Sequence, residues 1–198
     1  ILHQNNMGPS AARNNGINAA TTEYVYILDA DDLEEPTSLE YNYWALMKNP
    51  KKSWSFTAST GFQEKEYLWD VRFDPEGMKT QNTLSVSALI RKQDALSVGG
   101  YTIKEEAFDE DWHFWLKLMA KGYSCVQLRN EYLHWYRILN SGRMASIHTD
   151  NQKKERNKKI ISEQAAFVIN PKDPIIYPIT TYEEFANINE SKDVESIY

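Results

Sequence analysis

YVYILDADD, residues 24–32, is the stretch that decides the fold, because an apolar strand runs directly into three carboxylates. Open α/β sheets bind ligands at the carboxyl ends of their strands, so we expect Asp29, Asp31 and Asp32 at such an edge. Mg²⁺ and Mn²⁺ prefer oxygen ligands, and Mg²⁺ usually takes one or two carboxylates and leaves positions for substrate phosphates. The stretch therefore predicts a metal and nucleotide-diphosphate site. The alternative interpretation is an acidic loop that merely caps the next helix.

Length and composition exclude several classes of protein. The chain has 198 residues, enough for one domain with a real core, and its 41% hydrophobic and 25% charged content is typical of a globular protein. Its net charge of −6 argues against nucleic acid as a partner. A single cysteine, Cys125, suits a reducing compartment and is expected to be buried. With no apolar run long enough to span a bilayer and no signal peptide, we expect a cytoplasmic location.

Hydrophobic periodicity and turn residues predict alternating helices and strands. Helices are expected at 10–20, 36–48, 93–98, 108–121 and 150–168, and strands at 23–28, 53–59, 66–72, 84–91, 123–128 and 132–139. A turn is expected at Gly61. The strand at 23–28 is nearly all apolar, which favours a central position with a neighbour on each side. The alternation indicates a mixed-sheet α/β domain, followed by a C-terminal helix and an acidic tail.

Three segments occur in a characteristic order: QNNMGPSAARNNG at 4–16, LDADD at 28–32, and GGY at 99–101 followed by EDWHFWL at 110–116. Together they resemble the family 2 glycosyltransferases, which are inverting enzymes, and the run 82–91 also looks like that family's strand before the Gly-Gly turn. The resemblance implies a GT-A fold with a mixed, mainly parallel sheet flanked by helices. Residues 1–147 are then a partial catalytic domain and 148–198 a C-terminal helix and tail. Because such domains begin with strand-helix-strand units, we expect the N-terminal nucleotide-binding strands to be missing.

The resemblance also implies a donor site. Asp29 and Asp31 match the acidic motif that binds a divalent cation, Mn²⁺ or Mg²⁺, on the donor diphosphate, and Asp32 supports them. Arg13 and Asn14 match the A-R-N element that lies near the nucleotide. The expected co-substrate is a nucleotide-sugar, most simply a UDP-sugar.

A catalytic base is implied at the start of the helix near residue 110. Inverting transfer requires a base to take the proton of the acceptor hydroxyl as that hydroxyl attacks the anomeric carbon. Asp111 matches the family's base, with Glu110 beside it, although two acidic residues at a helix start also satisfy the helix dipole. Arg137, His134 and Trp112 are candidate contacts to phosphate or acceptor. Trp112 is also a candidate sugar-stacking residue, as are two further tryptophans, Trp69 and Trp135.

The basic run Lys153–Lys159 lies on the last expected helix. Such a run is usually a solvated face. The functional interpretation is a peripheral contact with anionic lipid at the inner face of a membrane, as for an enzyme with a lipid-linked acceptor.

The leading hypothesis is transfer of one sugar to a polysaccharide, lipid-linked or protein-linked acceptor with inversion. A metal-dependent nucleotidyl or phosphoryl transferase could use the same carboxylates, although no lysine-rich or Gly-rich phosphate loop is present. A non-catalytic GT-A-like remnant acting as a binding module is the third hypothesis.

Overall fold

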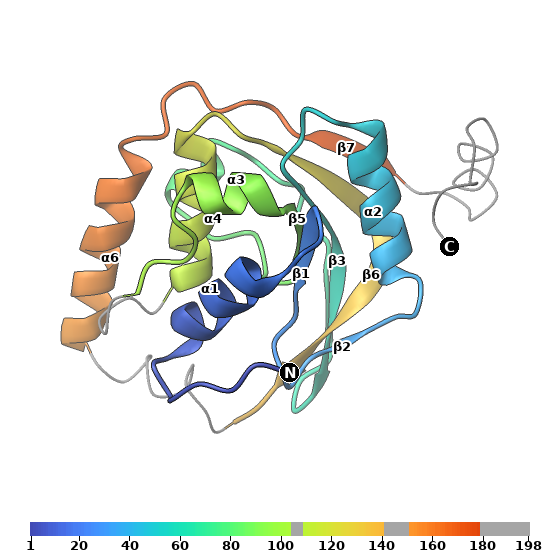
Figure 1. The fold of residues 1–198 in the computed structure, drawn as a ribbon, viewed down its shortest axis with the longest axis horizontal. Coiled ribbons are helices and arrows are strands. Elements are labelled where there is room, and N and C mark those ends of the chain that lie inside the picture. Colours follow the sequence, from blue (N-terminus) through green and yellow to red (C-terminus); the bar gives the residue numbers. More distant parts are fainter. Residues whose placement is uncertain (104–108, 141–150, 179–198) are drawn as a thin grey trace.

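A computed structural model describes residues 1–103, 109–140 and 151–178 (Figure 1). Its helices are α1 (Pro9–Ala19), α2 (Ser38–Lys48), α3 (Lys92–Ser97), α4 (Glu110–Ala120) and α6 (Asn151–Ala165), with a 3₁₀ helix at Gly77–Lys79. Its strands are β1 (Tyr24–Ile27), β2 (Leu33–Glu34), β3 (Trp54–Gln63), β4 (Tyr67–Trp69), β5 (Ala88–Arg91), β6 (Cys125–Ile138) and β7 (Ile175–Pro178). The five α-helices and strands β1, β3, β4, β5 and β6 overlap predicted elements, whereas β2 and β7 lie where no strand was predicted.

The strands form one mixed sheet in the order β1-β5-β3-β6-β2, with β4 paired to β3 and β7 paired to β6. The predicted mixed α/β class is confirmed, but the expectation of a mainly parallel sheet is wrong. Only β3–β6 and β6–β7 are parallel, whereas β1–β5, β2–β6, β3–β4 and β3–β5 are antiparallel. Antiparallel neighbours need only short connections, while each parallel pair needs a long crossover. The connection from β3 to its parallel partner β6 contains α3 and α4, and the connection from β6 to its parallel partner β7 contains α6.

Helices cover the sheet on both sides (Figure 1). Helix α2 lies on one face, while α1, α3, α4 and α6 lie on the other. Strand β7 adds to β6, with Val126 opposite Ile175, so part of the segment expected as a tail belongs to the sheet. Residues after Pro178 lie outside the described part of the chain.

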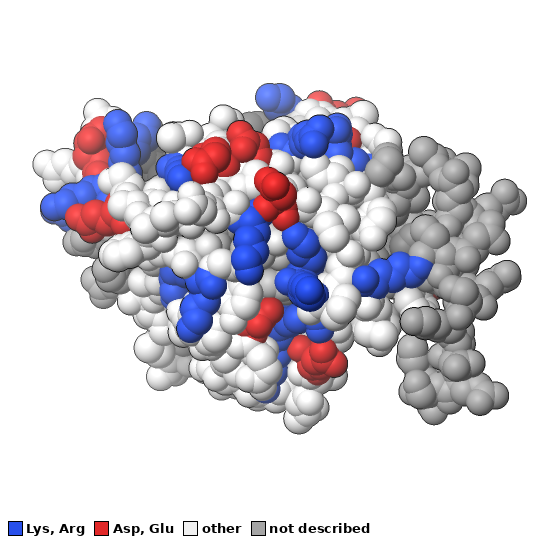
Figure 2. Space-filling view, turned by 90° about the horizontal axis from the view of Figure 1, so that it is seen from above, with Lys and Arg blue, Asp and Glu red and all other residues white. Residues whose placement is uncertain are grey.

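Basic and acidic side chains lie interspersed on the face seen in Figure 2. The same mixture holds on α6, where Lys154, Lys158 and Lys159 are exposed and Lys159 lies 4.0 Å from Glu163. No helix among the described residues has both the length and the apolar character needed to cross a bilayer. The lipid contact expected for Lys153–Lys159 therefore stays a prediction.

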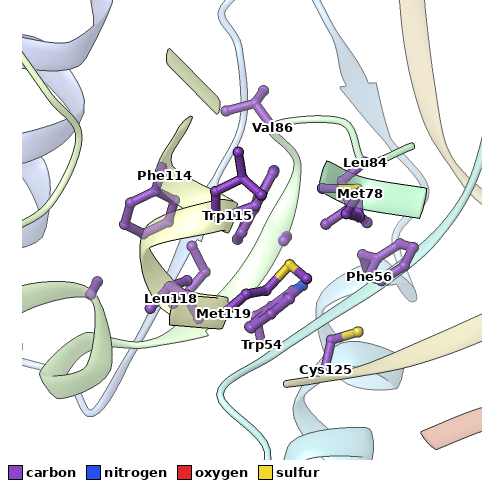
Figure 3. Packing of buried hydrophobic residues seen from close by; sticks show 14 of the residues in the cluster. Trp54, Phe56, Met78, Leu84, Val86, Phe114, Trp115, Leu118, Met119 and Cys125 are labelled. Carbon is purple, nitrogen blue, oxygen red and sulfur yellow. The ribbon is translucent and has the colours of Figure 1, made fainter. Parts of the chain in front are cut away.

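The larger core lies between the sheet and α1, α3, α4 and α6. Trp54 of β3 stacks on Trp115 of α4 with ring centroids 5.5 Å apart, and both side chains are fully buried (Figure 3). Cys125 is buried in the same cluster, as expected for a structural thiol. Large aromatic rings dominate the burial of apolar area, so this packing fixes the middle of α4 against the sheet.

Three local expectations differ from the structure. Gly61 lies inside β3, and the turn to β4 comes after Gln63, which has φ 81°. The two strands expected at 123–128 and 132–139 are one strand, β6, in which Asn130 has φ 66°. Strand β1 stands at the end of the strand order instead of in its middle. Its burial alternates, with Val25 and Ile27 buried, so its tyrosines pack on one face and its aliphatic residues on the other.

Candidate active site

One cavity of about 480 Å³ collects residues from distant parts of the sequence. It lies where β1 and β6 end, at the start of α4, and its other walls come from α1, β3, β4 and the loop before β5. The sequence-predicted residues that line it are Arg13, Asp29, Asp31, Trp69, Glu110, Asp111 and Arg137. The structure thus brings both expected carboxylate motifs to one cavity, at the strand edge where α/β folds bind ligands.

Arg13 joins the two acidic motifs. Its Nη2 lies 2.6 Å from Asp29 Oδ1, its Nη1 lies 2.9 Å from Glu110 Oε1, and the guanidinium stands 5.3 Å from the centre of the Tyr101 ring. Burial alone would lower the pKa of Arg13, but the attraction and hydrogen bond of Asp29 raise it. The guanidinium therefore stays charged between two carboxylates, as a bidentate cation suited to oxyanions.

Asp29 and Asp31 follow β1 and have different surroundings. Asp29 is paired with Arg13, whereas the Asp31 side chain is exposed and has no ion pair within the described part of the chain. The described residues contain no group of three or more His, Cys, Asp or Glu side chains arranged for a metal ion. Two carboxylates still fit a hard divalent cation that completes its coordination with substrate phosphate and water, which is how Mg²⁺ is usually held.

Arg137 holds the loop after β1 against the end of β6. Its Nε donates to the backbone oxygen of Asp31 at 2.6 Å, and its Nη1 donates to Gln63 Oε1 at 2.6 Å. The guanidinium also lies 4.6 Å from the centre of the Phe62 ring. It therefore places a positive charge in the cavity wall beside the backbone of Asp31.

Asp32 and His134 do not reach the cavity. Asp32 is buried, and its Oδ1 accepts a hydrogen bond from the backbone N–H of Arg137 at 2.8 Å. His134 is 2% exposed, and its ring contacts Ser59 Oγ at 2.9 Å, Ser87 Oγ at 3.0 Å and Asp32 Oδ2 at 3.2 Å. The expected contact of His134 with phosphate or acceptor is thereby corrected, because a ring fully engaged inside the protein cannot touch a ligand.

Asn14 and Trp112 also turn away from the cavity. The amide of Asn14 donates to the Tyr101 carbonyl at 2.8 Å and accepts from the Tyr101 N–H at 2.7 Å, so it holds the Gly-Gly-Tyr turn. Gly100 in that turn has φ 62°, and a Cβ there would collide with the Asn14 side chain. Trp112 donates its Nε1 hydrogen to the Met78 carbonyl at 2.7 Å. Both side chains are therefore held by contacts within the protein, and neither lines the cavity.

Glu110 and Asp111 begin α4 but face different partners. Glu110 is buried and pairs with Arg13. Asp111 has no ion pair among the described residues, while its Oδ1 accepts the Trp112 N–H at 2.8 Å and its Oδ2 accepts the Asn82 amide at 3.2 Å. Burial, and then the neighbouring Glu110 charge, raise the pKa of Asp111 to about 7. Glu110 is thus an ion-pair partner of Arg13, whereas Asp111 is a carboxyl group whose charge changes near neutral pH.

The cavity also contains residues without a motif. Asn82 fixes the Asp111 carboxylate and itself accepts the Leu84 N–H at 3.1 Å, so its orientation is set from both ends. The uncharged part of the cavity wall includes Tyr67, Trp69 and Ser85. A single asparagine or tyrosine in a loop carries no pattern that marks it as a ligand contact, and only Trp69 was recognisable as a stacking candidate.

The fold and this cavity define an α/β protein of the GT-A type. Residues 1–91 match the sequence model of the family described as Glycosyl transferase family 2. The uncharacterized glycosyltransferase MJ1057 of Methanocaldococcus jannaschii is 27% identical over 148 residues, which are 71% of this chain and 50% of that protein. The uncharacterized glycosyltransferase YibD of Escherichia coli is 55% identical over 40 residues, 20% of this chain and 12% of that protein. The N-terminal part of the chain is thus similar to glycosyltransferase family 2.

Solved structures agree with this fold. The crystal structure of S. aureus TarS 1–349 in complex with UDP-GlcNAc superimposes with a TM-score of 0.58 at 15% identity, covering 87% of this chain and 50% of that one. TarS 1–349 in complex with UDP gives a TM-score of 0.54 at 15% identity, covering 87% of this chain and 48% of that one. At this identity the likeness concerns the fold alone. The chain spans about half the length of MJ1057 and of the TarS structure.

Proposed function

We propose that this chain carries the catalytic centre of an enzyme that transfers a sugar from a nucleotide-sugar to an acceptor hydroxyl with inversion. The observation that carries the proposal is that Arg13, Asp29, Asp31 and Asp111 line one cavity. The family match over residues 1–91 and the UDP-GlcNAc named for TarS support a UDP-sugar as the donor. The acceptor class is a glycan, free or linked to lipid or protein. All residues assigned to this chemistry fall within 1–147, the segment proposed as the catalytic domain.

The donor diphosphate belongs at the charged end of the cavity. Arg13 and Arg137 offer guanidinium groups there, and planar guanidinium groups match phosphate oxygens. Asp29 and Asp31 are the residues that would hold a divalent cation, and a bound cation would stabilise the charge of the departing diphosphate as a Lewis acid. Since Arg13 already pairs with Asp29, a cation or phosphate arriving there competes for existing contacts, and Asp31 is the more accessible ligand.

Asp111 is the better base of the two neighbouring acids. A general base works best when its pKa lies near the working pH, and the pKa of Asp111 is raised to about 7. Glu110 is already committed to Arg13 at 2.9 Å, so its charge serves to hold that guanidinium. Two hydrogen bonds and the packed start of α4 keep the Asp111 carboxylate in one orientation.

The transfer is a single displacement. The acceptor oxygen forms a bond to the anomeric carbon while the bond from that carbon to the diphosphate oxygen breaks. The electron pair of the breaking bond leaves on the diphosphate, and the proton of the acceptor hydroxyl passes to Asp111. Attack from the side opposite the leaving group inverts the anomeric configuration. The arginines near the diphosphate and the base on the acceptor side thus have separate tasks.

The test is an assay of products with a panel of donors. Purified protein is incubated with Mn²⁺ and UDP-glucose, UDP-galactose or UDP-N-acetylglucosamine, with and without a mixture of oligosaccharide acceptors. We expect UDP to be released from one donor, faster with acceptor, and at least about tenfold more slowly in Asp31→Asn, which loses the more accessible carboxylate. The control is Glu40→Gln, an exposed change on α2 across the sheet, which should leave the rate unchanged.

Two results would overturn the proposal. Release of UMP and a sugar phosphate in place of UDP would identify a nucleotidyl or phosphoryl transferase. UDP binding in a titration without release from any donor would identify a binding module that lacks catalysis.

A further inference from the structure

Strand β4 presents two aromatic side chains to the cavity. Tyr67 and Trp69 line it, and the register places Trp69 opposite Ser59 and Tyr67 opposite Gly61 of β3. Alternate residues of a strand point to opposite faces, and Leu68 between them is not part of the cavity wall. The aromatic pair therefore belongs to the cavity face of β4, and Leu68 belongs to the other face.

The orientation of this pair is built into the fold. A Cβ on Gly61 would collide with the Tyr67 ring, so the absence of a side chain at Gly61 lets that ring lie against the backbone of β3. The Tyr67 and Trp69 rings have centroids 6.2 Å apart and planes inclined by 46°. Together they form an angled wall instead of a flat stack. Trp69 remains 40% exposed, so this wall is open to a ligand.

The other two candidate stacking residues are excluded by their contacts. The indole Nε1 of Trp112 donates to the Met78 carbonyl at 2.7 Å, and that of Trp135 donates to Glu35 Oε1 at 2.7 Å. Neither residue lines the cavity. Trp69 is the one of the three that does, and an exposed indole in a ligand cavity is not explained by core packing.

Uncharged polar groups accompany the aromatic wall. Asn82, Thr83 and Ser85 line the cavity from the loop before β5. The Ser85 side chain makes no hydrogen bond to other described residues, while Asn82 is bonded to the Asp111 carboxylate. Aromatic faces together with neutral hydroxyl and amide groups suit a ligand that is apolar on one face and hydroxylated at its rim.

We infer that Trp69 and Tyr67 form a subsite for a pyranose ring of the acceptor, which presents a hydroxyl to Asp111. A pyranose with equatorial hydroxyls has just this amphipathic shape, because its axial C–H groups gather on its faces. The charged residues Arg13, Asp29, Asp31 and Arg137 suit the diphosphate, which leaves the uncharged wall for a neutral sugar. The assignment of this sugar to the acceptor rests on the proposed function.

The subsite is tested by binding of methyl β-D-glucopyranoside, observed by saturation-transfer NMR in the presence of saturating UDP and diamagnetic Mg²⁺. The expected signals are stronger on H1, H3 and H5, which share one face, than on H2 and H4. Trp69→Ala should raise the dissociation constant of the glucoside by about tenfold or more, while Trp69→Phe should retain part of the affinity. Leu68→Ala is the matched control on the opposite face of β4, and it should bind as the wild type does. Because Trp69 is exposed, circular dichroism should show all three variants folded.

The outcomes separate the subsite from the function. Unchanged glucoside binding in folded Trp69→Ala would overturn the inference. Loss of UDP affinity in Trp69→Ala, measured by calorimetry without glucoside, would also overturn it, since the indole would then stack on the nucleobase. Glucoside binding that depends on Trp69, in a protein that releases no UDP from any donor, would support a sugar subsite and contradict the transfer reaction instead.

Discussion

Replacing Asp111 by Asn should stabilise the protein, and more so at high pH than at low pH. The pKa of Asp111 is about 7 in the folded protein and about 3.9 in an unfolded chain. Between these pH values the folded state binds a proton that the unfolded state has released. The free energy of unfolding therefore falls as pH rises from about 4 to about 7, and the effect is complete above that.

The magnitude follows from this difference. Between pH 5 and pH 8, only the part below the pKa of about 7 counts, which is about two pH units. Each pH unit lowers the free energy of unfolding of the wild type by about 1.36 kcal/mol, so the loss is about 2.7 kcal/mol. The carboxylate keeps partial access to water, and screening reduces the effect to about 2 kcal/mol. Asparagine is neutral at every pH and keeps the shape of the side chain. The stabilisation by Asp111→Asn should thus be about 2 kcal/mol larger at pH 8 than at pH 5, or about 4–8 °C in Tm for a chain of this size.

The assay is urea denaturation at pH 5 and pH 8 at equal ionic strength, followed by tryptophan fluorescence. Glu66→Gln is the matched control, because it removes one carboxylate from an exposed position outside the site. An Asp111→Asn effect of equal size at both pH values, or one larger at pH 5, would refute the reasoning that burial and Glu110 disfavour the ionised form.

Three further changes test other parts of the site. Arg13→Met removes the partner of buried Glu110 and should lower the free energy of unfolding by about 3 kcal/mol, with a loss below 1 kcal/mol contradicting a structural ion pair. Gly100→Ala introduces both a strained φ and a collision with Asn14, and should lower the free energy of unfolding by about 1–3 kcal/mol. Gly99→Ala, whose Cβ meets nothing, should lower it clearly less, and an equal loss for both variants in urea denaturation would argue against the collision. Asp31→Asn should weaken the Mn²⁺-dependent part of UDP affinity in calorimetry, and an unchanged affinity would exclude this carboxylate as a ligand.

The sequence could predict most helices and the mixed α/β class, because apolar periodicity is a local signal. The helix containing Trp115 and Met119 repeats its apolar residues at helical spacing and is found almost where expected. Strand pairing is not local, since it depends on which distant strand becomes the neighbour. Periodicity therefore did not indicate that most strand pairs would be antiparallel, or that β1 would lie at the end of the strand order.

In the site, too, the sequence indicated which residues matter but not where their side chains point. The motifs identified Asp29, Asp31, Glu110 and Asp111, because carboxylates after a strand and at a helix start gather at one sheet edge, but they did not mark Asp109, which also lines the cavity. They could not indicate that Asp32, next to Asp31, would turn inward to the N–H of Arg137, or that His134 would be enclosed between two serines. Adjacent residues point in different directions, and the direction is set by packing that a short motif does not encode.

The most direct test of the account is to compare turnover and UDP affinity in two neighbouring variants, Asp111→Asn and Glu110→Gln. Asp111→Asn should reduce turnover by about 10²–10⁴ through loss of the proton acceptor, while UDP affinity measured by calorimetry stays within about twofold of the wild type. Glu110→Gln should instead weaken UDP binding, because it releases Arg13 from its place in the cavity. Wild-type turnover in Asp111→Asn, or the pattern expected for Asp111 appearing in Glu110→Gln, would contradict the assignment of Asp111 as the base.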